Sequence, residues 1–300
     1  MKIHHLNCAT CCPMGGHLMD GITPGIGPAK LVCHTLLIET EQGLVLIDTG
    51  MGMEDVHHPK ERISAFFRKV LRPISRENET AYYQIKELGF KPEDVRHIVL
   101  THLDFDHAGG IDDFPNATVH LLDSELKASQ DRKTFISKGR YSTAQLTHSK
   151  DWTTYHPMGE RWYGFQCVRD LKGLPPEILL IPLVGHTEGH CGVAVETDRG
   201  WLLHAGDAYF YRGELDKIYH CTPGLRAYQK MMEVNRELRL KNQERLRHLA
   251  QNYQHEVTIF SAHDAIEYLS LREGGETYLK SASVSPWKST PYDEASLGLS

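Results

Sequence analysis

The chain has 300 residues, of which 40% are hydrophobic and 24% charged, and this composition is typical of a globular rather than a disordered protein. Its 39 Asp and Glu outnumber its 33 Lys and Arg and give a net charge of −6, which argues against a general binder of nucleic acid or anionic membranes. The sequence also contains 19 His, so metal ligation is the first hypothesis to test.

Nothing in the sequence indicates membrane insertion or secretion. No apolar run approaches the roughly 20 residues that span a bilayer, and the first residues lack the apolar stretch of a secretory signal. Seven irregularly spaced Cys indicate free thiols in a reducing compartment, and we interpret the run with Cys8, Cys11 and Cys12 as a loop over the site. We therefore expect a cytoplasmic protein with a small-molecule substrate and without nucleic-acid or membrane partners. A homodimer is compatible with these features.

In chain order, the hydrophobic pattern predicts alternating strands and helices. Two apolar runs, 31–39 and 44–48, predict a β-hairpin, and a helix-rich stretch covers 59–88. We expect further strands at 97–100, 117–122, 178–184, 191–196, 201–204 and 257–260. The spacing of apolar residues over 225–248 predicts one long amphipathic helix.

The remaining segments do not form a second domain. The pattern is weak over 124–176, where aromatic residues are scattered among polar ones, and we interpret this segment as an insertion or lid over the core. The tail at 281–300 is expected to be peripheral. The prediction is a single domain over 1–300 in the α/β class, because strands and helices are interleaved.

The strongest chemical signal is the run from Thr101 to Gly110, directly after a predicted strand. It places four side chains that can bind a metal, His102, Asp104, Asp106 and His107, within six positions. Open α/β sheets place their sites at the carboxyl ends of strands. Such a density of ligands at that position indicates a metal site.

Three later segments repeat this arrangement of a strand end followed by a ligand. His186 lies in a Gly-His-Thr-x-Gly-His run that ends at His190, Asp207 follows the next hairpin, and His263 follows the last predicted strand. A single His at a strand end is more often structural than a ligand. Together, these residues can complete a site that begins at His102.

These motifs, in this order and over nearly the whole chain, resemble those of the metallo-β-lactamase superfamily, including a strand that ends in Asp48-Thr49-Gly50. The resemblance implies an αβ/βα four-layer sandwich of two mixed sheets with helices outside, and two divalent metal ions at one edge. It implies that His102 and His186 bind the first ion, that Asp106, His107 and His263 bind the second, and that Asp207 bridges them. It also implies that Asp48 and Thr49 support the ligand loops and that His190 is structural.

Asp104 departs from the superfamily pattern, which has His at this position. A carboxylate is compatible with a bimetallic site, since di-iron relatives have Glu there. With Asp104, two divalent ions, three carboxylates and a bridging hydroxide sum to zero charge; with His the sum is +1. Zinc is the expected metal, and the extra carboxylate favours harder ions such as Mn²⁺ or Fe²⁺ as alternatives. Asp is also shorter than Glu, so a role for Asp104 outside the ligand set stays open.

The chemistry that these ligands support is metal-assisted hydrolysis, in which the ions hold and acidify a water. Asp106 could relay the proton as well as bind metal. Tyr209 and Tyr211 lie shortly after Asp207 and are candidates for hydrogen bonding to the developing oxyanion, although aromatic packing explains them equally well.

We therefore predict an enzyme, a metal-dependent hydrolase of carboxylic esters, with a lactone of the N-acyl-homoserine type as the best single guess. Thioester or phosphodiester hydrolysis is the alternative within hydrolases. A di-iron oxidoreductase on the same fold is the alternative from another class, although the chain lacks the flavodoxin domain of such relatives. A non-catalytic protein is disfavoured because the ligand set is complete.

Overall fold

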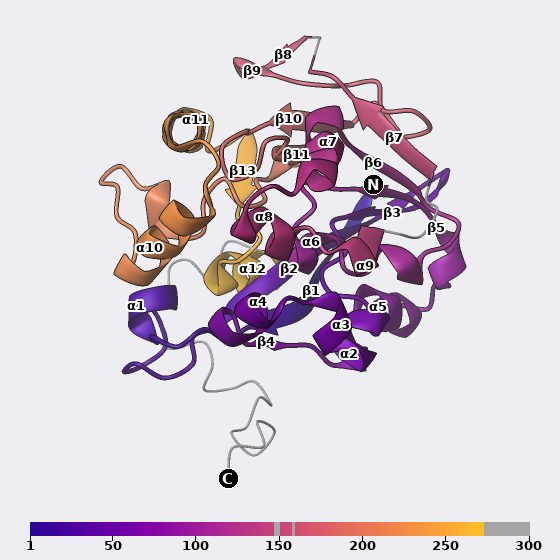
Figure 1. The fold of residues 1–300 in the computed structure, drawn as a ribbon. Coiled ribbons are helices and arrows are strands. Elements are labelled where there is room, and N and C mark those ends of the chain that lie inside the picture. The colour runs from indigo at the N-terminus through magenta and orange to yellow at the C-terminus, as the bar shows by residue number, and fades with distance from the viewer. Residues whose placement is uncertain (147–150, 158–159, 273–300) are drawn as a thin grey trace.

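The structure is a computed structural model that describes residues 1–146, 151–157 and 160–272, and its centre is formed by two large β-sheets (Figure 1). The larger sheet has the order β4-β1-β2-β3-β5-β6-β7 and the smaller the order β10-β11-β12-β13. The strands of the larger sheet are β1 (Lys2–Cys11), β2 (Leu31–Thr40), β3 (Gly43–Ile47), β4 (Pro73–Ile74), β5 (Val95–Val99), β6 (Thr118–Leu122) and β7 (Asp151–Tyr155). Those of the smaller sheet are β10 (Ile178–Pro182), β11 (Cys191–Thr197), β12 (Gly200–His204) and β13 (Val257–Phe260). A separate two-stranded ribbon consists of β8 (Arg161–Trp162) and β9 (Phe165–Gln166).

Both large sheets are mixed. In the larger one, the pairings β4–β1, β1–β2 and β2–β3 are antiparallel, whereas β3–β5, β5–β6 and β6–β7 are parallel. In the smaller one, only the β12–β13 pairing is parallel. The strands at the centre of the larger sheet are rich in Val, Ile and Leu because both of their faces are covered.

The helices and 3-10 turns connect these strands and cover the outer faces. The α-helices are α1 (His17–Asp20), α2 (Met53–His57), α3 (Pro59–Arg62), α4 (Ala65–Val70), α5 (Ala81–Glu87), α6 (Phe105–Ala108), α7 (Asp123–Asp131), α8 (Phe135–Arg140), α9 (Thr143–Leu146), α10 (Pro223–Met232), α11 (Arg236–Asn252) and α12 (Ala265–Arg272). The 3-10 turns are η1 (Glu77–Glu79), η2 (Pro92–Asp94), η3 (Ile111–Asp113) and η4 (Arg212–Glu214). None of the helices in the described ranges is long and apolar enough to cross a bilayer.

The hydrophobic core lies in separate layers. Between the two sheets, Ile47 and Val99 of the larger sheet belong to the same buried cluster as Val193 and Phe260 of the smaller one. Ile85 of α5 packs in a cluster on the other face of the larger sheet. Leu246 and Leu249 of α11 pack against the smaller sheet. This helix–sheet–sheet–helix order is the αβ/βα four-layer sandwich that the resemblance implied.

The predicted helix over 225–248 is two helices, α10 and α11. The chain breaks between them because the Gly185 carbonyl accepts hydrogen bonds from the backbone N–H groups of Val234 (2.9 Å) and Asn235 (3.1 Å). The Asn235 side chain then caps α11 by accepting from Leu238 N–H. A Cβ at Gly185 would lie 2.5 Å from the Arg239 backbone nitrogen, so glycine is required for this close approach.

Two further expectations differ from the structure. The cysteine-rich run is not a loop: Cys8 and Cys11 belong to β1, which lies inside the larger sheet, and all seven Cys are buried and free. Part of the segment 124–176 belongs to the core rather than lying over it. Its strand β7 pairs in parallel with β6 and extends the larger sheet. The tail at 281–300 lies outside the described residues.

Candidate metal centre

The predicted ligands lie on four loops, each of which follows a strand. His102, Asp104, Asp106 and His107 follow β5, His186 follows β10, Asp207 follows β12 and His263 follows β13. The structure brings all seven side chains together, and each is at most 6% exposed. Their burial matters because ionisable groups that are not paired or bound to metal are costly to bury.

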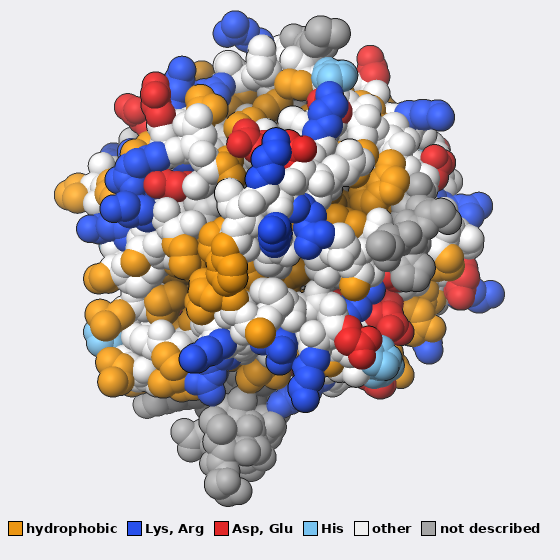
Figure 2. Space-filling model, in the orientation of Figure 1, with side chains coloured by type: hydrophobic (Ala, Val, Ile, Leu, Met, Phe, Trp, Pro, Cys, Tyr) orange, Lys and Arg blue, Asp and Glu red, His pale blue; other side chains and the backbone are white. Residues whose placement is uncertain are grey.

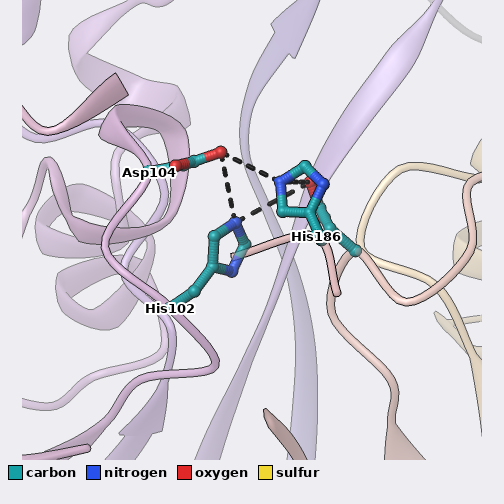
Figure 3. A group of neighbouring side chains, drawn as sticks. His102, Asp104 and His186 are labelled. Carbon is teal, nitrogen blue, oxygen red and sulfur yellow. Dashed lines mark hydrogen bonds and ion pairs between the residues drawn. The ribbon is translucent and has the colours of Figure 1, made fainter. Parts of the chain in front are cut away.

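Three of these side chains, His102, Asp104 and His186, point toward one another (Figure 3). Asp104 Oδ2 lies 3.5 Å from His102 Nε2 and 3.0 Å from His186 Nε2. Asp207 Oδ2 completes the set, at 3.8 Å from His102 Nε2 and 3.4 Å from His186 Nε2. We call these four atoms the first group.

A second group lies on the other side of Asp207. Asp207 Oδ1 is 3.3 Å from His107 Nε2 and 3.1 Å from His263 Nε2, and these two nitrogens are 3.3 Å apart. Asp106 Oδ2 lies 3.8 Å from His263 Nε2. Asp207 therefore presents one carboxylate oxygen to each group.

The spacing within both groups fits metal ions. Zinc–ligand bonds of about 2.0–2.2 Å in a tetrahedron place neighbouring ligand atoms about 3.3–3.6 Å apart, close to the distances measured here. His102 Nε2 is also buried without a hydrogen-bond partner among the described residues, although it is aimed into the first group. A metal ion at this position would satisfy it, so the residues present fit two divalent ions.

Asp48 orients both His102 and His107. Its carboxylate accepts hydrogen bonds from the Thr101 backbone and hydroxyl and from His107 Nδ1, each at 2.8 Å. Since the Thr101 hydroxyl donates to Asp48, it accepts from His102 Nδ1–H at 2.9 Å, which leaves His102 Nε2 unprotonated. Carboxylate–histidine contacts of this kind fix the tautomer and ring orientation of metal ligands.

Backbone contacts hold the remaining ligands. His263 Nδ1 donates to the Val32 carbonyl (2.7 Å), and the Thr49 hydroxyl donates to the His107 carbonyl (2.9 Å). His190 does not reach either group; its Nε2 accepts the Asp207 backbone N–H at 2.8 Å. Asp48, Thr49 and His190 therefore lie where the resemblance implied, behind the ligands.

Arg140, at the end of α8, is a site residue that the sequence did not reveal. It is 1% exposed, and its guanidinium contacts both oxygens of Asp104, with Nε 2.8 Å from Oδ1 and Nη2 2.9 Å from Oδ2. Nη1 donates to the backbone carbonyls of His186 (2.9 Å) and Met232 (3.2 Å). A lone Arg in a weakly patterned segment carries no signal that would place it beside residue 104.

The two neighbouring carboxylates of the loop have different electrostatic environments. Although burial opposes ionisation of Asp104, the Arg140 guanidinium and His102 hold the pKa of Asp104 well below its ordinary value. Burial raises the pKa of Asp106, and the negative charges of Asp207 and Asp104 add to this rise, against the opposing effect of His107 and His263. The arginine thus distinguishes the surroundings of Asp104 from those of Asp106.

The predicted phenols are placed differently from expectation. The Tyr209 hydroxyl donates to Glu267 (2.9 Å) inside the core, so Tyr209 is not available to a substrate. Tyr211 contacts the His220 ring edge-on and lines, with His263, a small cavity.

Tyr228, on α10, is the phenol that the sequence analysis missed. Burial and the nearby carboxylates of Asp106, Asp104 and Asp207 raise the pKa of Tyr228 well above its ordinary value. Its ring contacts Phe210, which in turn stacks on His263. The sequence did contain a signal for Tyr228. It lies on the apolar face of the helix predicted over 225–248, and its hydroxyl gives that face a polar group.

Comparison with known proteins gives consistent results. Residues 29–247 match the sequence profile of a family described as the metallo-beta-lactamase superfamily. A "probable metallo-hydrolase" of Mycobacterium tuberculosis is 39% identical over 273 residues, which cover 91% of this chain and 83% of the relative. An N-acyl homoserine lactonase of Bacillus cereus is 25% identical over 202 residues, covering 67% of this chain and 73% of the relative.

Solved structures share the fold. An N-acyl homoserine lactone hydrolase, solved with N-hexanoyl-L-homoserine at its catalytic metal centre, superposes with a TM-score of 0.67 at 23% identity. The alignment covers 90% of this chain and 95% of that structure. At this level of identity the similarity establishes the fold.

Proposed function

The chain belongs to the metallo-beta-lactamase superfamily and is a metallo-hydrolase, and we propose that it opens carboxylic esters, with a lactone as substrate, at a centre of two divalent metal ions. We expect zinc in both positions, and the ligands are those of the first and second groups. Among the relatives are proteins named N-acyl homoserine lactonases, which support a lactone of that type.

One observation carries the proposal: the two oxygens of Asp207 face two separate groups of ligand atoms. Two divalent ions held by these groups would supply the chemistry of an acidified water and a polarised carbonyl. The protein holds the ligands rigidly for this task, since Asp48, Thr101 and the Val32 carbonyl fix the imidazole rings.

Asp106 and Tyr228 are the groups proposed to act on the substrate. Asp106 lies at the second group, with Oδ2 3.8 Å from His263 Nε2, and from there its carboxylate can accept and pass on a proton. Tyr228 keeps its proton because its pKa is raised well above the ordinary value. A protonated phenol beside the centre donates a hydrogen bond to the oxygen on which charge develops.

The surface formed by α1, α8 and α10 suits a substrate with an apolar part. Figure 2 shows apolar side chains gathered on the same side of the molecule as α1, α10 and α8 in Figure 1. Large exposed side chains on or next to these helices include Leu18, Phe135, Met231 and Val234. An acyl chain attached to the lactone would find apolar contacts there.

The first test is metal content and loss of function. Protein purified without added metal should hold close to two ions per chain, and Asp207→Ala should abolish hydrolysis, because several kcal/mol of transition-state stabilisation corresponds to roughly 10³-fold or more in rate. Asp131→Ala, an exposed carboxylate on the surface, is the matched control and should keep full activity. Fewer than one ion per chain, or unchanged turnover of Asp207→Ala, contradicts the proposal.

The second test defines the bond that is broken. Lactones, thioesters and phosphodiesters are compared with the zinc, manganese and iron forms of the protein. Preferential hydrolysis of lactones supports the proposal, whereas activity only with oxygen and a reductant points to an oxidoreductase.

A further inference from the structure

The ion pair between Asp104 and Arg140 is completely buried, and stabilisation of the fold does not explain it well. Removing two charges from water costs several kcal/mol per ion, and apolar residues of similar volume often replace a buried ion pair without loss of stability. Arg140 is nevertheless among the largest fully buried side chains of the chain, and it contacts a side chain of the first group directly.

The pair also has a specific effect on charge. A carboxylate at position 104 adds one negative charge to the ligands, but the guanidinium of Arg140, within 2.9 Å of it, cancels that charge. The ion pair therefore has the same net charge as a neutral imidazole. The expectation that Asp104 shifts the metal preference toward harder ions was based on a charge sum that included the carboxylate but not the positive charge of Arg140.

Contacts of Arg140 also fix the direction in which Asp104 points. Nη1 is held by the His186 and Met232 carbonyls, so the guanidinium plane is anchored independently of Asp104. The ion pair of Nε with Oδ1 and the hydrogen bond of Nη2 to Oδ2 then hold the carboxylate with Oδ2 toward His102 and His186, and Nη2 itself lies 3.0 Å from His186 Nε2. The shorter Asp side chain thus reaches the first group.

We propose that Asp104 and Arg140 act as one unit in place of a neutral histidine: Asp104 binds the first metal ion, and Arg140 is a positioning residue that aims the carboxylate and neutralises it. This inference rests on the proposed function, because it requires a metal ion in the first group. It predicts that a histidine at position 104 restores zinc binding only when the positive charge of Arg140 is removed as well.

The test is a double-mutant cycle read by zinc affinity, measured by competition with a chromogenic chelator. Asp104→His leaves a buried guanidinium without a counter-charge beside the metal position, so one of the two zinc ions should bind about 10–100-fold more weakly. The double variant Asp104→His/Arg140→Met removes that charge and should bind within a few-fold of the parent. Asp104→His/Arg239→Met removes a different buried Arg, paired with Glu233, and should stay weak.

A second cycle protects the test against misfolding of the histidine variants. Asp104→Asn and Asp104→Asn/Arg140→Gln change volume little, and the double variant should bind zinc more tightly than the single one. The inference is overturned if Asp104→His keeps the parent affinity, or if removing Arg140 fails to improve binding in either cycle. If the parent binds two ions but the cycles show no coupling, only this inference fails; a parent with fewer than one ion also contradicts the proposed function.

Discussion

Two buried arginines, Arg62 and Arg140, support the same ligand loop in different ways. Arg62 contacts Asp55 (2.8 Å) and Asp112 (3.0 Å) and donates to the Gly109 carbonyl (3.1 Å), so it holds the backbone just beyond His107. Arg140 contacts the side chain of Asp104, which itself belongs to the first group. The first arginine stabilises the loop, whereas the second is the one that we propose sets the charge and direction of a metal ligand.

Burial and ion pairing alone do not distinguish an arginine with a functional role from one with a structural role. Both side chains are at most 6% exposed, and both pair with Asp. What differs is the carboxylate in each pair: Arg62 contacts Asp55, which lies outside both groups, whereas Arg140 contacts Asp104, which belongs to the first group. Variants of the two regions should therefore change different measured quantities.

Arg62→Met should have the largest effect on stability. It leaves the buried Asp55 carboxylate without its partner, and breaking one side of a buried pair costs about 3–5 kcal/mol. The free energy of unfolding is measured by denaturant titration at saturating zinc, together with the zinc affinity of the folded protein. Zinc affinity that falls together with stability would show that the two arginines have the same role.

Asp113, which accepts Met53 N–H beside the Arg62 network, makes the stability of this region depend on pH. Burial and the neighbouring charges of Asp55 and Asp112 raise the pKa of Asp113 to about 7. Because the folded protein holds this proton more tightly than the unfolded chain, stability falls as pH rises from about 4 to about 7, by on the order of 2–4 kcal/mol. Asp113→Asn should remove this fall in unfolding titrations across that range, and parallel curves for parent and variant would contradict it.

Tyr228→Phe should lower turnover without changing the stability that depends on the Arg62 region. Loss of one hydrogen-bond donor to a developing oxyanion lowers kcat by about 100-fold, while zinc content and the free energy of unfolding should stay close to those of the parent. Tyr209→Phe, whose hydroxyl bonds Glu267, is the matched control and should keep its kcat. Equal kcat values for Tyr228→Phe and the parent would exclude the proposed role of the phenol.

The sequence was sufficient to predict the fold and the side chains that come together at its centre, because both depend on local patterns. Most strands were recognisable from continuous apolar runs, and each ligand directly follows such a run. His102 and His263 could be assigned from their chain neighbours, although 161 positions separate them, because strand ends meet at one edge of an α/β fold.

Features that depend on contacts between distant segments could not be predicted. The break before Asn235 is caused by the carbonyl of Gly185, and the pairing of Arg140 with Asp104 joins α8 to a loop 36 residues earlier. Neither leaves a periodic trace in the chain. The phenols depend on such contacts too. Closeness in sequence to Asp207 made Tyr209 and Tyr211 candidates beside the alternative of aromatic packing, whereas Tyr228, which the carboxylates of Asp106, Asp104 and Asp207 influence, is distant from them in sequence.

The end of α10 contacts the loop that carries His186, and this contact has a consequence for protein engineering. The Gly185 carbonyl accepts from Val234 and Asn235, and Arg140 donates to the carbonyls of Met232 and His186, so the end of α10 and the His186 loop share one set of hydrogen bonds. If His186 binds metal as proposed, substitutions in α10 that are chosen to widen the substrate range are expected to alter metal retention as well. Libraries built on this helix should therefore be screened with zinc in excess, so that variants with a useful pocket are not discarded for having lost their metal.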